Sequence, residues 1–83
     1  MDDRIKELIS VGASVTANCQ PCLQYHVGKA LESNATELEI SEAIAVAKTV
    51  RKGAGAKMDK FAAQVFNSAE IAVNTSEQGC GCG

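Results

Sequence analysis

The chain has 83 residues and a mass of 8.6 kDa, which is the size of one small domain. Eight Lys and Arg stand against ten Asp and Glu, so the chain lacks the basic excess that nucleic-acid binding favours. No stretch approaches the roughly 20 apolar residues that a membrane span needs, and residues 1–7 are charged, unlike a signal peptide. We therefore expect a cytoplasmic protein that binds neither nucleic acid nor membrane.

The core must be built from small side chains. The chain contains one Tyr, two Phe and no Trp, and it is rich in Ala. Small side chains suit closely packed helices but bury little apolar area per residue, so a single copy would be only marginally stable. We expect the chain to form a homo-oligomer.

An acidic cap and an apolar stripe predict the first helix. Asp2 or Asp3 can cap its N-terminus, where acidic residues are favourable. Apolar residues then recur at helical spacing. We expect this helix to end near residues 17–18.

Pro21 marks the start of a second helix. It fits the first turn, where its missing N–H would have no partner within the helix. Asn18 or Cys19 is then the capping residue. An apolar stripe continues on one face, and the helix should end at residues 32–34.

A long third helix is predicted from Thr36 onward. Thr36 and Glu39 have the spacing of a capping box, in which each side chain accepts the backbone N–H of the other residue. The apolar face that follows, with some drift, comprises Leu38, Ile40, Ile44, Ala47, Val50, Ala54, Phe61, Val65 and Phe66. Gly53 and Gly55 either break the helix or permit close approach of another helix. We expect close approach, because their neighbours are Ala.

The sequence as a whole predicts an all-α fold, a helix pair followed by a long Ala-rich helix. Nothing alternates with period two, and no hairpin signal separates two β-branched runs. We expect a helical domain over residues 1–73, with residues 71–73 extending or docking the last helix. Residues 74–83 should then form a flexible tail that carries Cys80 and Cys82.

Cys19, Cys22 and His26 form the most informative motif, Cys-x-x-Cys-x-x-x-His. On a helix these positions fall within roughly a 60° sector. A helix N-terminus stabilises a thiolate, and His26, one turn after Cys22, can take or return its proton. Cys19 can attack an oxidised Cys22 and close an intramolecular disulfide. The motif predicts a dithiol redox centre.

Three other interpretations stay open. The cysteines can serve packing alone, or the chain can be a binding subunit with a vestigial site. They can also bind zinc or an iron–sulfur cluster, for structure or electron transfer. The candidate ligands would be Cys19, Cys22, His26, Cys80 and Cys82.

Glu7 followed twelve residues later by Cys19-x-x-Cys22-x-x-x-His26 resembles the active-site pattern of the carboxymuconolactone decarboxylase superfamily, and more narrowly its alkylhydroperoxidase D-like branch. The resemblance covers roughly residues 4–67. It implies an all-helical fold assembled as a trimer or hexamer, and a thiol-based peroxidase or disulfide reductase that needs no organic cofactor.

The resemblance also implies roles for the site residues. In the branch, a relay runs from the Glu through the first Cys and a water to the His, which activates the second Cys. Carried over, Glu7 and His26 form the proton relay, Cys22 attacks a disulfide or hydroperoxide, and Cys19 resolves. A dithiol or thioredoxin-like donor would supply electrons. The chain departs from the best-known members at Pro21, where they carry a second His.

Two further segments carry weaker signals. Cys80 and Cys82 lie outside the family pattern and can act as an electron relay to a partner, as a soft-metal site, or as a spare end. The basic residues around Arg51 predict a solvated face that steers anionic partners. Met58 and Phe61, at helical spacing, predict a core or a subunit interface.

Overall fold

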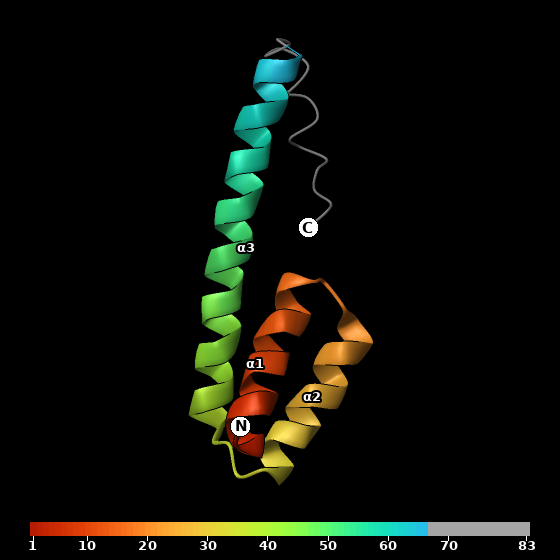
Figure 1. Cartoon of the computed structure of the whole chain (residues 1–83), viewed down its shortest axis with the longest axis vertical. Coiled ribbons are helices and arrows are strands. Elements are labelled where there is room, and N and C mark those ends of the chain that lie inside the picture. The colour runs from red at the N-terminus through yellow and green to blue at the C-terminus, as the bar shows by residue number, and fades with distance from the viewer. Residues whose placement is uncertain (67–83) are drawn as a thin grey trace. The chain divides into compact units, whose positions relative to one another are not determined.

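The computed structural model describes residues 1–66, which form three helices (Figure 1). They are α1 (Asp3–Thr16), α2 (Gln20–Glu32) and α3 (Glu37–Val65). No residue from 1 to 66 is in a strand, so the all-α prediction is confirmed. None of these helices is both long and apolar enough to cross a membrane. The predictions for residues 71–73 and for the 74–83 tail lie outside the described residues.

Each helix begins at a residue with a predicted capping role. The side chain of Asp2 accepts the backbone N–H of Arg4 at 3.1 Å and caps α1. Cys19, one of the two predicted caps, is the N-cap of α2. At α3, the Glu39 N–H donates to Thr36 Oγ1 and the Thr36 N–H donates to Glu39 Oε1, both at 3.0 Å. The predicted capping box is therefore confirmed.

An Asn in the left-handed region follows the C-cap of both α1 and α2. Asn18 has a φ of 58° and Asn34 a φ of 72°. In each case the next residue donates its N–H five residues back, from Cys19 to Ser14 and from Ala35 to Ala30, both at 3.0 Å. This is the Schellman arrangement, which satisfies carbonyls at the helix end.

Residues Met1–Gly53 form a compact unit with its own core. Val11 of α1, Ala30 of α2, Ala35 of the following turn and Ile40 of α3 are buried together. Helix α2 runs antiparallel to α1, whereas the first part of α3 runs in the same direction as α1 (Figure 1). The core thus lies where all three helices meet.

Contacts along α1 define its parallel register with α3. Arg4 forms an ion pair with Glu39 near the start of both helices. Further along, a Cβ built on Gly12 would lie 3.5 Å from the Ala43 carbonyl oxygen and 3.8 Å from the Ala47 Cβ. Gly12 therefore marks the point of close approach between α1 and α3.

The expected close helix contact at Gly53 and Gly55 is not found within the described residues. Helix α3 continues through both glycines, and no atom of this part of the chain lies within 4 Å of a Cβ placed on either. Residues 52–66 are all exposed, so Met58 and Phe61 do not lie in a core of the single chain, and the alternative that they form a subunit interface stays a prediction. Of the predicted α3 stripe, only Ile40 and Ala47 are buried, and both lie in the part of α3 that belongs to the Met1–Gly53 unit.

The capping box predicts that the free energy of unfolding decreases at acidic pH. The backbone N–H of Thr36 and then the Arg4 guanidinium hold the pKa of Glu39 below its ordinary value. A depressed carboxyl pKa stabilises the fold above the unfolded-state pKa, and this contribution is lost as pH falls through the folded-state value. We expect unfolding measured from pH 7 to pH 3 to show a smaller loss of stability below about pH 4.5 for Glu39→Gln than for wild type. Glu42→Gln, at an exposed α3 position, is the control. Identical pH curves for wild type and Glu39→Gln would contradict the prediction.

Candidate active site

The two cysteines lie where α1 ends and α2 begins. Cys19 precedes the first residue of α2, and Cys22 lies in its first turn. Their Cα atoms are 5.3 Å apart and their sulfurs form a disulfide, a separation typical of that bond. The Cys19 N–H donates to the Ser14 carbonyl at 3.0 Å, and its own carbonyl accepts the Leu23 N–H at 3.1 Å. Backbone hydrogen bonds therefore fix Cys19 on both sides.

The two cysteines differ in exposure. Cys22 is exposed, whereas Cys19 is half-buried. Cys22 also lies where unpaired N–H groups give the helix N-terminus a partial positive charge, which favours a thiolate once the disulfide is reduced. A molecule that approaches from solvent would therefore reach Cys22 more easily than Cys19.

Glu7 and His26 come together from two helices. Glu7 Oε1 on α1 lies 2.7 Å from His26 Nδ1 on α2, and the Glu7 side chain is only 14% exposed. An ionised carboxylate can only accept, so with Glu7 ionised Nδ1 is the donor, and the tautomer of a neutral imidazole that carries its proton on Nδ1 has Nε2 as its proton acceptor. The carboxylate contacts the imidazole itself, which differs from the relay through Cys19 and a water that the resemblance implies.

His26 has an aromatic neighbour on the same helix. The Tyr25 and His26 rings meet edge to face, with centroids 5.0 Å apart. Lys29 Nζ lies 5.7 Å from the centre of the Tyr25 ring. Tyr25 is exposed, so it presents an aromatic surface beside the histidine.

Arg51 of α3 contacts the end of α1 and the turn that precedes Cys19. Its Nη1 donates to the Val15 carbonyl at 2.9 Å and to Asn18 Oδ1 at 2.8 Å. The predicted solvated basic face is therefore wrong for Arg51, which is half-buried against the end of α1, although Lys52 is exposed. The sequence offered one indirect signal for this contact: α1 has no basic residue in its last turn to complement the helix dipole.

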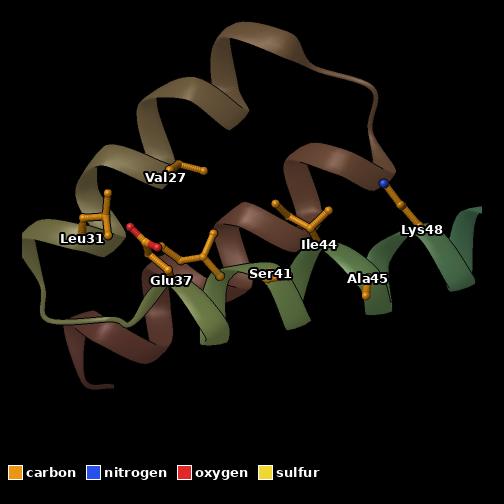
Figure 2. Close-up of a pocket in the computed structure, with 8 residues that line it drawn as sticks. Val27, Leu31, Glu37, Ser41, Ile44, Ala45 and Lys48 are labelled. Carbon is orange, nitrogen blue, oxygen red and sulfur yellow. The ribbon is translucent and has the colours of Figure 1, made fainter.

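An apolar groove lies between α2 and α3 (Figure 2). Its volume is about 470 Å³, and it is lined by Val27, Leu31, Glu37, Ile40, Ser41, Ile44, Ala45 and Lys48. None of Glu7, Cys19, Cys22 or His26 lines it. The groove is thus separate from the candidate site, although Val27 directly follows His26 in the chain.

The metal interpretation has no built site in the described part of the chain. Residues 1–66 contain no group of three or more His, Cys, Asp or Glu side chains placed to hold an ion. Cys80 and Cys82, the other candidate ligands, lie outside the described residues. Their roles as ligands or as an electron relay stay predictions.

Comparison with known proteins agrees with this fold and motif. The family model of the carboxymuconolactone decarboxylase family matches residues 1–65, and the chain belongs to this family. A crystal structure of a Methanobacterium thermoautotrophicum protein, a structural genomics target, superposes with a TM-score of 0.66 and 39% identity, covering 80% of this chain and 71% of that one. The predicted family is confirmed.

Two curated relatives are described only as uncharacterized. "Uncharacterized protein 4 in cox locus" of Paracoccus denitrificans is 41% identical over 54 residues, which are 65% of this chain and 49% of that protein. An uncharacterized protein of Cupriavidus necator is 31% identical over 64 residues, which are 77% of this chain and 57% of that protein. The chain thus spans about half the length of the curated relatives it matches.

Proposed function

We propose that the protein is a cysteine-based thiol–disulfide oxidoreductase that reduces disulfides or hydroperoxides with Cys19 and Cys22. The observation that carries this proposal is the disulfide between these residues at the first turn of α2, with Cys22 exposed. A disulfide at an exposed helix N-terminus is accessible to exchange, because an incoming thiol can reach its sulfur and the helix stabilises the leaving thiolate.

The reaction with a disulfide substrate proceeds in two exchanges. The Cys22 thiolate attacks one substrate sulfur, the substrate S–S bond breaks, and one substrate thiol leaves. Cys19 then attacks the Cys22 sulfur of the mixed disulfide and releases the second substrate thiol. The substrate gains two electrons and two protons, and the enzyme retains the Cys19–Cys22 disulfide.

A hydroperoxide would oxidise the same sulfur. The Cys22 thiolate attacks the terminal peroxide oxygen, the O–O bond breaks, an alcohol leaves, and Cys22 becomes a sulfenic acid. Cys19 displaces water from that sulfenic acid and closes the disulfide. In both cases an external dithiol, such as a thioredoxin-like donor, reduces the disulfide and becomes oxidised itself.

His26 and Glu7 are the proposed proton relay. The unprotonated Nε2 of His26 accepts the Cys22 proton, and the Glu7 carboxylate at Nδ1 stabilises the imidazolium that results. No step uses a metal or an organic cofactor. The direct contact supports a pairwise relay between the two side chains.

The proposal includes a cytoplasmic homo-oligomer, a trimer or hexamer as in the family. The large apolar side chains of α3 that are exposed in the single chain include Val46, Val50, Met58, Phe61 and Val65. Several of them follow at three- or four-residue intervals, which places them on one face of the helix. Contact between copies would remove that face from water.

Thiol counting with peptide mapping tests the proposed function. The full reduced chain is treated with a small aliphatic disulfide or an alkyl hydroperoxide, alkylated, and digested with trypsin. Cleavage after Lys6 and Lys29 places Cys19 and Cys22 on one peptide and Cys80 and Cys82 on another. We expect the first peptide to take up no alkyl group and to weigh two mass units less than its unalkylated dithiol form, whereas the same peptide from untreated reduced protein carries two alkyl groups.

Metal analysis of anaerobically purified protein separates the alternative. Stoichiometric zinc or an iron–sulfur absorbance, with thiols protected from the oxidant, would overturn the proposal in favour of a metal site. Free thiols that persist after oxidant treatment without any metal would also overturn it.

A further inference from the structure

In the turn between α1 and α2, the residues that end α1 are followed directly by the N-cap of α2. Asn18 is left-handed, and the next residue, Cys19, both closes the Schellman motif of α1 and caps α2. The position of Cys19 therefore depends directly on the backbone conformation of Asn18. A different φ at this residue would turn Cys19 away from Ser14 and from the first turn of α2.

The Arg51 side chain of α3 hydrogen-bonds to this turn. Residues other than Gly adopt positive φ at an energetic cost, which Asn tolerates better than most. The Asn18 side chain accepts from Arg51 Nη1 at 2.8 Å, and the same nitrogen donates to the Val15 carbonyl at 2.9 Å. Both are charge-assisted hydrogen bonds, and they place a positive charge at the negative end of the α1 dipole.

We infer that Arg51 is a positioning residue of the dithiol site, which clamps Asn18 and thereby holds Cys19 within bonding reach of Cys22. The inference rests on the proposed function and adds to it a residue outside the Cys-x-x-Cys-x-x-x-His motif. The hydrogen bonds of Arg51 go to Val15 and Asn18, so it acts on the sulfurs through the turn.

The clamp should favour the closed disulfide. When Cys19 and Cys22 oxidise, two thiols lose two electrons and two protons, and oxidised glutathione accepts them as its S–S bond breaks to give two glutathione molecules. The equilibrium constant rises with the fraction of time the reduced chain keeps its two sulfurs together. Loosening Asn18 lowers that fraction and therefore lowers the constant.

The test measures this constant for the full chain in glutathione redox buffers. Samples are quenched, alkylated and digested, and the oxidised fraction of the tryptic peptide 7–29 is read by mass. We expect Arg51→Met to lower the constant about 3- to 10-fold relative to wild type, because two charge-assisted hydrogen bonds to the turn are lost.

Arg4→Met is the matched control. It removes the ion pair that Arg4 of α1 forms with Glu39 of α3, at the opposite end of α1 from the Arg51 contacts. We expect Arg4→Met to lower thermal stability but to leave the disulfide constant within about twofold of wild type. Equal shifts for both variants would overturn the inference, because they would indicate general loosening.

Asn18→Asp provides a second reading if Arg51→Met folds poorly. The added carboxylate pairs with the Arg51 guanidinium and, like Asn, tolerates the left-handed region. We expect the constant to rise, and the rise to disappear in the Arg51→Met background. A constant unaffected or lowered by Asn18→Asp would contradict the inference.

These outcomes also separate the inference from the proposed function. If wild type forms no Cys19–Cys22 disulfide in any buffer, the proposed function fails. If wild type forms it and Arg51→Met matches wild type, only the role of Arg51 fails.

Discussion

Disulfide reduction should fall by at least about 10³-fold when Cys22 is replaced by Ser, because a hydroxyl cannot replace the thiolate that attacks the substrate. Cys19→Ser should lose turnover for a different reason. Its Cys22 can still attack, but the mixed disulfide has no neighbouring thiol to resolve it. The measurement is steady-state reduction of a small disulfide with a dithiol donor, together with the mass of the trapped adduct.

The outcomes assign the role of each sulfur. An adduct on Cys22 in Cys19→Ser supports the proposed order, whereas an adduct on Cys19 in Cys22→Ser would reverse it. Full turnover in both variants would end the dithiol proposal. A variant with Ser at both Cys80 and Cys82 is the control, and unchanged reduction of a protein disulfide by it would remove the tail from the electron path.

Glu7→Gln should slow the reduction of disulfides about 10- to 100-fold, with His26→Gln slower still, because general acid–base groups contribute about 10²–10⁴-fold. The amide can still hydrogen-bond to Nδ1, but it carries no charge to stabilise the imidazolium that forms when His26 takes the Cys22 proton. The measurement combines kcat/KM with the rate at which iodoacetamide alkylates Cys22 at neutral pH.

Glu32→Gln is the matched control for Glu7→Gln. Glu32 is an exposed acid on α2 that pairs with Lys29, so its loss removes one charge without touching His26. Thermal unfolding of each variant checks that the fold survives. If Glu7→Gln alkylates and turns over like Glu32→Gln, Glu7 has only a structural role.

Local signals were sufficient to predict the helices and their starts. Asp2, Thr36 with Glu39, and Pro21 act on the backbone within a few residues, so their effects follow from sequence spacing alone. The Cys19–Cys22 geometry is also local. Two residues separated by three positions at the start of a helix have a restricted distance between their Cα atoms.

Contacts between helices were beyond sequence reasoning. Sequence spacing does not predict the Arg51 contact with Asn18, and the Glu7–His26 pair follows only from a resemblance, because each contact depends on how two helices pack. The sequence also predicts a longer buried face on α3 than the described residues have. Helical periodicity identifies an apolar face but does not say how much of its length a short helix pair can cover.

Cys19, which closes the C-terminal motif of α1 and is the N-cap of α2, limits how the length of this segment can change. Because Cys19 completes the end of one helix and starts the next, an insertion or deletion between Asn18 and Cys22 would separate the sulfur pair from both helices at once. The segment from Asn18 to Cys22 must therefore keep a fixed length. Change around the sulfur pair is therefore confined to replacement of side chains, for example at the exposed Tyr25 beside His26.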